Sequence, residues 1–215
     1  MSEPSSTSAP EPRWPALVAV IASAGLYAAL PPQLAMGPGW LQPVIIVPVA
    51  VAGMVAHYRG NPRVNTVLGY LSAGAITVFM LWSLVLLVKA LPAHREPPVL
   101  LLRSAVALWI TNVLVFALWY WRIDGGGPHM RHKRKQEERS SFLFPQMILP
   151  ADWPDADDWS PIFVDYLYLS FNTSTAFSPT DTPVLTRWAK VLTMVQASIS
   201  LTVVAVLAAR AVNIL

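Results

Sequence analysis

The sequence contains no cysteine, and this absence excludes several kinds of site. A chain without thiols forms no disulfide framework, offers no thiolate to a metal and has no cysteine nucleophile. Charged residues are also scarce, because they make up 13% of the 215 residues, whereas soluble domains usually carry about 25%. Since 54% of the residues are hydrophobic, the composition predicts a membrane protein.

Patterns that would indicate an enzyme or a metal site are missing as well. The four histidines form no HxxxH or HExxH pair, and the acidic segment 151–158 lacks the glycine-centred loop of an EF-hand. No nucleophile and base stand together at a plausible membrane depth. We therefore predict no enzymatic activity, no bound metal and no cofactor.

What the sequence does have is a series of long apolar segments. A membrane helix needs about 20 mostly apolar residues, and the segment 161–182 is the most polar of the candidates. That segment either spans the bilayer or re-enters it on one side. The pattern predicts an all-α, polytopic membrane protein with about six transmembrane helices, or five and a re-entrant helix. The six segments are 14–30, 40–57, 64–91, 99–121, 161–182 and 190–215.

Polar segments divide the chain further. The Ser- and Pro-rich residues 1–13 predict a disordered tail. We expect a four-helix membrane region at 14–121 and a polar cytoplasmic connection at 122–160. Residues 161–215 would then form a C-terminal helix pair.

Basic residues indicate the orientation, since Lys and Arg concentrate in cytoplasmic loops. The cluster that follows the fourth segment predicts a cytoplasmic surface that contacts anionic lipid headgroups, and the N-terminus is predicted to be cytoplasmic too. We expect the last helix to end in the cytoplasm, so that segment 161–182 carries the chain back outward. The basic residues lie in short clusters between apolar runs, which favours membrane lipids as partners and no nucleic acid. The lipid-facing cluster comprises Arg131, Lys133, Arg134 and Lys135.

Polar side chains within apolar segments are candidate functional residues, because a carboxylate or amide at membrane depth is costly unless it is paired or wetted. Asp165, Asn172 and Gln196 are the candidates. We expect Asn112 to be a hydrogen-bond partner between helices. Small residues at Gly69 and Ala73 offer a packing face, which favours a homo-oligomer.

Residues 168–192, YLSFNTSTAFSPTDTPVLTRWAKVL, resemble the pore module of two-helix potassium channels in layout. The resemblance implies that Thr173, Thr175, Ser178 and Asp181 line a pore. The glycines that let a potassium filter expose its carbonyl groups are absent, because Ala-Phe-Ser-Pro occupies residues 176–179. The segment is therefore similar to a degenerate pore module, and no potassium-selective filter is expected.

Most of the chain looks like a family of bacterial multi-pass membrane proteins of unknown function. The segment YLSFNTSTAFSPTD and the C-terminal residues 211–214, AVNI, carry this resemblance. The resemblance implies a bacterial inner-membrane location and implies no particular activity. Two hypotheses stay open, a small helical bundle without an assigned activity and a channel-like pathway for ions or small solutes. A third, an intramembrane enzyme, has the least support, because no nucleophile–base pair or metal triad stands at a plausible depth.

Overall fold

The computed structural model describes residues 12–93, 97–127, 140–150, 159–175 and 180–211. These parts contain no β-strand, so the all-α fold predicted from the sequence is confirmed. They contain three short 3-10 helices and six α-helices. The 3-10 helices are η1 (Pro32–Leu34), η2 (Asp124–Gly126) and η3 (Pro145–Ile148). The α-helices are α1 (Trp14–Ala28), α2 (Leu41–Tyr58), α3 (Pro62–Ala93), α4 (Pro98–Ile123), α6 (Phe163–Thr175) and α7 (Arg187–Ala211).

Prolines mark several of the helix starts. Pro15 lies in the first turn of α1, and α3 and α4 begin at Pro62 and Pro98. A proline fits the first turn because its missing N–H group has no partner there in any case. Pro48 lies inside α2, which continues past it to Tyr58.

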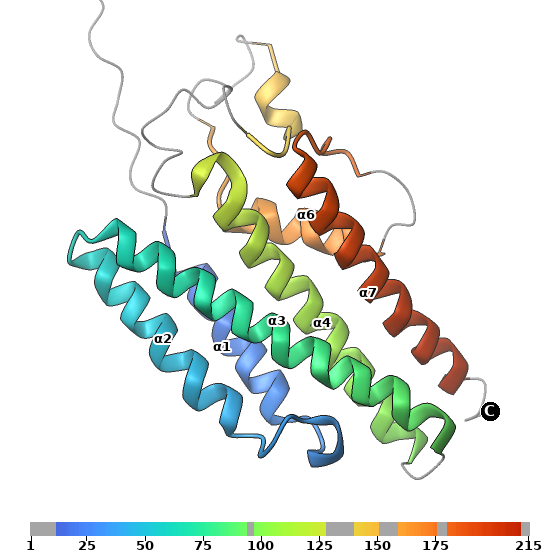
Figure 1. The fold of residues 1–215 in the computed structure, drawn as a ribbon. Coiled ribbons are helices and arrows are strands. Elements are labelled where there is room, and N and C mark those ends of the chain that lie inside the picture. The colour runs from blue at the N-terminus through green and yellow to red at the C-terminus, as the bar shows by residue number, and fades with distance from the viewer. Residues whose placement is uncertain (1–11, 94–96, 128–139, 151–158, 176–179, 212–215) are drawn as a thin grey trace, which may run out of the picture.

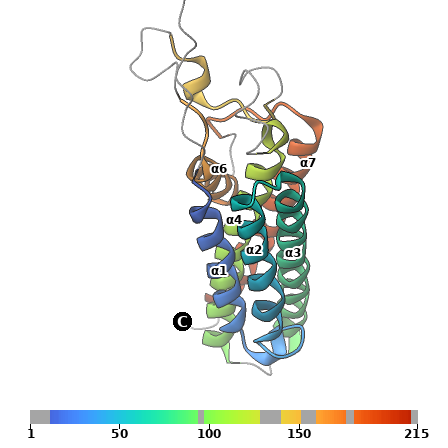
Figure 2. The ribbon, with the colours of Figure 1, turned by 90° about the vertical axis from the view of Figure 1, so that its left-hand side faces the viewer.

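Helix α4 lies at the centre of the bundle and contacts α1, α3, α6 and α7. In Figure 1, α2, α3, α4 and α7 run along roughly one direction, and the shorter α6 crosses them near one end. The view in Figure 2 places α1, α2, α3 and α4 side by side. Helices α2 and α3 pack against each other and complete the bundle next to α1.

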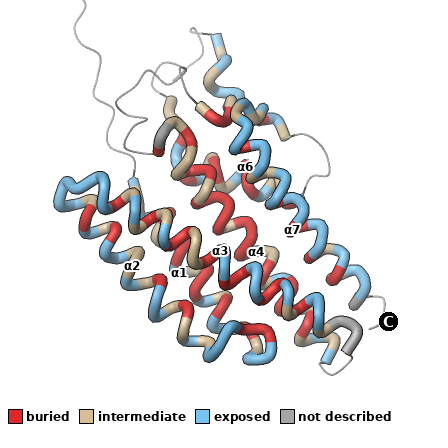
Figure 3. The backbone as a smooth tube through the Cα atoms, viewed as in Figure 1, coloured by how far each residue is buried: buried red, intermediate tan, exposed pale blue. Residues whose placement is uncertain are grey.

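Burial follows this arrangement, as Figure 3 shows. The central helix α4 is buried over much of its length, including the aromatic side chains of Phe116, Tyr120 and Trp121. The outer faces of α2, α3 and α7 expose large apolar side chains, among them Val44, Val78 and Met194. Apolar outer faces on several helices at once are typical of a bundle surrounded by lipid.

Four of the described helices, α2, α3, α4 and α7, are long and apolar enough to cross a membrane. The apolar α1 has 15 residues and α6 has 13. At a rise of 1.5 Å per residue α6 is roughly 20 Å long, shorter than a hydrocarbon core of about 30 Å. The fold is therefore that of a membrane-type helical bundle with two shorter helices.

The segment around α6 returns to the end of the bundle from which it starts. The ring of Phe163, at the start of α6, contacts Trp121 in the last turn of α4 with centroids 5.8 Å apart. After α6, Leu185 N donates a hydrogen bond of 2.8 Å to the carbonyl of Ser141, which lies beside the same end of α4. Of the two courses predicted for segment 161–182, a crossing and a return on one side, the contacts of its described flanks fit the return. Helix α7 starts beside this end of α4 and runs away from it, antiparallel to α4.

Candidate functional site

A cluster of buried polar side chains joins α4, α6 and α7, and we call it the polar cluster. Each helix contributes two residues whose spacing places them on one helix face, since positions four apart or two turns apart line up. None of the six side chains is more than 4% exposed. The members are Asn112 and Tyr120 of α4, Ser170 and Ser174 of α6, and Gln196 and Ser200 of α7.

Gln196 is the centre of the polar cluster. Its amide nitrogen Nε2 lies 2.8 Å from both the carbonyl oxygen and the hydroxyl oxygen of Ser170, and 2.7 Å from Ser174 Oγ. Its amide oxygen accepts a hydrogen bond from the hydroxyl of Tyr120. One side chain on α7 thus binds both α6 and α4.

Asn112 makes a second link between α4 and α7. Its Nδ2 donates hydrogen bonds to Ser200 Oγ at 2.8 Å and to the carbonyl of Gln196 at 3.3 Å. This confirms the expectation that Asn112 is a hydrogen-bond partner between helices. Ser170 Oγ also donates to the carbonyl of Val113 at 2.7 Å, which fixes α6 against α4. Because hydrogen bonds are stronger in a low-dielectric interior, these links hold the three helices in one arrangement.

A buried carboxylate, Asp124, lies where α4 ends. The hydroxyl of Tyr166 donates to its Oδ2 at 2.6 Å, Ser140 Oγ lies 3.0 Å from its Oδ1, and the amide of Ser141 donates to the same oxygen. Gly125 and Gly127 adopt positive φ angles of 58° and 89°, which lets the chain turn directly after this carboxylate. Asp124 therefore ties the end of α4 to α6 and to the segment that follows the turn.

The residues predicted to line a pore do not meet in one described cavity. Thr173 is half-buried, and its hydroxyl donates to the carbonyl of Leu169 at 2.8 Å. Thr175 is exposed and donates to the carbonyl of Phe171 at 2.9 Å. Asp181 is exposed beyond the end of α6, and Ser178 lies outside the described residues.

The three predicted intramembrane polar residues have different surroundings. Gln196 lies fully buried in the polar cluster. Asp165 accepts a hydrogen bond from the amide of Ile162 at 2.7 Å, so its carboxylate caps the start of α6. Asn172 is half-buried on α6. The predicted lipid-facing residues Arg131, Lys133, Arg134 and Lys135 lie outside the described residues.

Sequence reasoning missed Asp124, Tyr120 and Tyr166. A signal existed for Asp124, because a negative charge at a helix C-terminus opposes the helix dipole and therefore needs donors nearby. The two tyrosines gave no such signal, since they are frequent at helix ends in membrane proteins without any partner. Across the parts of the chain that the structure describes, three or more His, Asp or Glu side chains nowhere come close enough to hold a metal ion.

Comparison of the chain with protein-family models, with curated proteins and with solved structures found no match. The two resemblances noted in the sequence, to a family of bacterial membrane proteins and to a pore module, therefore stay predictions.

Proposed function

We propose that this chain is an integral protein of the cell membrane with five crossings, formed by α1, α2, α3, α4 and α7, and with α6 as a helix that enters and leaves on one side. The backbone pairing of Phe142 with Val184 carries the proposal, because it holds the exit of the α6 segment beside the end of α4. On this basis the chain crosses the membrane an odd number of times. Its N-terminus lies in the cytoplasm, and α7 ends outside.

The distribution of basic residues supports this orientation. With α7 running outward, the order of the segments in the sequence assigns only four of the fifteen Lys and Arg residues to the outer side and the other eleven to the inner side. This bias toward the cytoplasm is larger by one residue than it would be if α6 crossed the membrane, because Arg187 and Lys190 move to the inner side and Arg210 moves to the outer side. The four outer residues are Lys89, Arg95, Arg103 and Arg210.

Single cysteines test the proposal, since the chain has none of its own. Ile162 precedes α6 in the sequence and Leu185 follows it, and both side chains are exposed. Cysteines at these two positions should therefore react with a membrane-impermeant maleimide from the cytoplasmic side only. Tyr58→Cys is the inner control and Gln33→Cys the outer control. If Ile162→Cys and Leu185→Cys react from opposite sides, α6 crosses the membrane and the proposal is wrong.

A second candidate function is a channel-like pathway for ions or small solutes. The observation that favours it is a helix that ends partway through the bundle, because Phe171 near the end of α6 contacts Trp109 near the middle of α4. Half-length helices of this kind occur beside permeation pathways. Because Thr175 and Asp181 lie exposed on a single chain, the pathway requires a second copy to enclose it.

Flux through reconstituted liposomes tests this second candidate. Protein with the native Asp181 should release a trapped monovalent cation faster than empty liposomes, and Asp181→Asn should slow the release of cations relative to chloride. Asp165→Asn, a change at a carboxylate that caps α6 near the bundle end, is the matched control. Release at the rate of empty liposomes for several cations and for chloride would contradict the pathway.

A further inference from the structure

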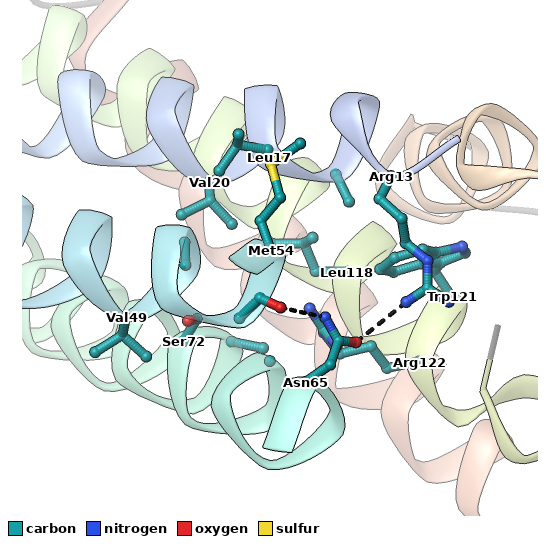
Figure 4. Close-up of a pocket in the computed structure, with 15 residues that line it drawn as sticks. Arg13, Leu17, Val20, Val49, Met54, Asn65, Ser72, Leu118, Trp121 and Arg122 are labelled. Atoms are coloured by element: carbon teal, nitrogen blue, oxygen red, sulfur yellow. Dashed lines mark hydrogen bonds between the residues drawn. The ribbon is translucent and has the colours of Figure 1, made fainter. Parts of the chain in front are cut away.

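A cavity lies between α1, α2, α3 and α4, at the end of the bundle where α1 begins and α4 ends (Figure 4). Its enclosed volume is about 40 Å³, and the empty space along its walls and open mouth together is about 510 Å³. The charged side chains among its described lining residues are Arg13, which directly precedes α1, and Arg122 of α4. Most of the remaining lining is apolar.

The two guanidinium groups share one aromatic ring. Arg13 Cζ lies 5.5 Å and Arg122 Cζ lies 5.2 Å from the ring centroid of Trp121. Arg13 also donates a hydrogen bond of 3.1 Å to Asn65 Oδ1, and Asn65 Nδ2 donates to the carbonyl of Gly53 at 2.7 Å. The contacts to Trp121 are favourable, but they hold two positive charges close together.

One guanidinium nitrogen of Arg122 has no acceptor within the described part of the chain. It is the Nε atom, which is buried, and no carboxylate is among the described residues that line the cavity. A half-buried cation with an unpaired donor is costly in apolar surroundings unless an anion lies near it. The cavity therefore has the charge and, at Arg122, the unpaired donor to bind an anion.

The neighbouring helix α3 leaves space for the side chain of Arg122. Its guanidinium group lies directly over Gly69 of α3, where any Cβ atom would overlap with it. The hydroxyl of Tyr70 donates to the backbone carbonyl of Arg122 at 3.2 Å and fixes the end of α4 beside α3. The arginine thus occupies a space that α3 leaves open for it.

We infer that this cavity binds an anionic phospholipid of the inner leaflet. The phosphate would lie at the guanidinium group of Arg122 with Arg13 beside it, because a guanidinium group binds phosphate oxygens through paired N–H donors. One acyl chain would lie along the apolar wall. A soluble anion would leave that wall unused, and basic pockets between helices on the cytoplasmic side are known to suit lipid headgroups. The wall consists of Leu17, Val20, Val49, Met54 and Leu118.

The inference rests on the membrane location proposed above, and lipid titration tests it. The melting temperature of the full-length protein in an uncharged detergent is measured with increasing phosphatidylglycerol, phosphatidylcholine or sodium phosphate. We expect stabilisation at lower concentrations of phosphatidylglycerol than of phosphatidylcholine, and none from sodium phosphate. Arg122→Gln should weaken the response to phosphatidylglycerol by about tenfold.

Two further variants keep the test decisive. Arg13→Gln reports on the same site if Arg122→Gln does not fold. Arg63→Gln removes an exposed charge from the same end of the bundle outside the cavity, so it should keep the native response. Equal responses to the two lipids, an equal loss in Arg63→Gln and Arg122→Gln, or equal stabilisation by sodium phosphate would each overturn the lipid site. If the protein responds equally to both lipids but still needs detergent for solubility, the lipid site is wrong and the proposed membrane location still holds.

Discussion

At the scale of single residues, Gln196 illustrates how one side chain orders three helices. Its amide uses its oxygen and its nitrogen at once, toward Tyr120 on α4 and toward Ser170 and Ser174 on α6. A solute pathway would need polar groups that remain available to a passing ion. The oxygen and the nitrogen of the Gln196 amide are instead both hydrogen-bonded within the chain, so the first role of this side chain is structural.

Replacement of Gln196 by leucine should destabilise the protein. The variant leaves the hydroxyls of Tyr120 and Ser174 buried without this partner, so we expect a loss of about 2 kcal/mol in the free energy of unfolding. Unfolding in mixed detergent micelles, followed by circular dichroism, measures the loss. Ser198→Ala on the exposed face of α7 is the matched control, because its hydroxyl bonds only to its own helix at Met194. Equal stability of Gln196→Leu and Ser198→Ala would contradict the role given to Gln196.

Two glycines of α3 offer a sharper comparison. A Cβ atom at Gly69 would overlap with the Arg122 guanidinium, whereas a Cβ atom at Gly74 meets nothing within 4 Å. Gly69→Ala should therefore cost about 1–3 kcal/mol of unfolding free energy. Gly74→Ala should be neutral or stabilising by up to about 1 kcal/mol, because alanine favours helix.

The same detergent unfolding assay separates these two glycine variants. Adding Arg122→Ala to Gly69→Ala removes the overlap and should recover part of the lost stability. A Gly69→Ala protein as stable as Gly74→Ala would show that Arg122 is free to move away.

Predictability at this scale depends on whether a residue stands out from its neighbours. Gln196 and Asn112 stand out because they are amides within apolar runs, and the sequence placed both inside the bundle. Arg122 lies in the last turn of α4. Its pairing with Arg13 could not be predicted, because the two lie 109 positions apart in the chain and only the packing of α1 on α4 brings them together.

At the scale of elements, the position of α6 depends on Asp124. This carboxylate binds Tyr166 of α6 and Ser141 of the segment that pairs with residues after α6. Asp124→Ala should therefore loosen the contacts of α6 and of the segment around Ser141. We expect it to cost about 2–3 kcal/mol of unfolding free energy, because several buried donors lose their acceptor. Hydrogen exchange should rise at residues 141–143 and in the first turn of α6.

Asp181→Asn serves as the control for this prediction, since Asp181 is exposed. It should leave both the stability and the hydrogen exchange near native values. If exchange at residues 141–143 is the same in Asp124→Ala and in the native protein, the carboxylate does not hold this end of α6.

The sequence predicts the elements well where the cause is local. Apolar runs and prolines set the bounds of α1 to α4 to within a few residues, because both act through neighbouring positions. The course of the chain around α6 depends on the pairing of Phe142 with Val184 across 42 positions. No local pattern encodes that contact, so the sequence allowed both a crossing and a return.

At the scale of the whole molecule, the odd number of proposed crossings places the two termini on opposite sides of the membrane. A fusion of alkaline phosphatase after Leu215 should therefore be active, because that enzyme folds only outside the cytoplasm. The same enzyme fused in place of the segment 128–139 should be inactive. Activity of the internal fusion and none of the C-terminal fusion would reverse the proposed orientation. A homo-oligomer stays a prediction at this scale.

The hydrogen bonds of the polar cluster between α4 and α7 can form only after α7 has been synthesised. Asn112 on α4 binds Ser200 on α7, and 88 positions separate the two residues. At a synthesis rate of about 5–20 residues per second, roughly 4 to 18 seconds pass between the appearance of the two partners. During this interval α4 carries an amide and a tyrosine hydroxyl without their partners on α7. The newly made four-helix segment is therefore a candidate client for membrane chaperones until α7 arrives.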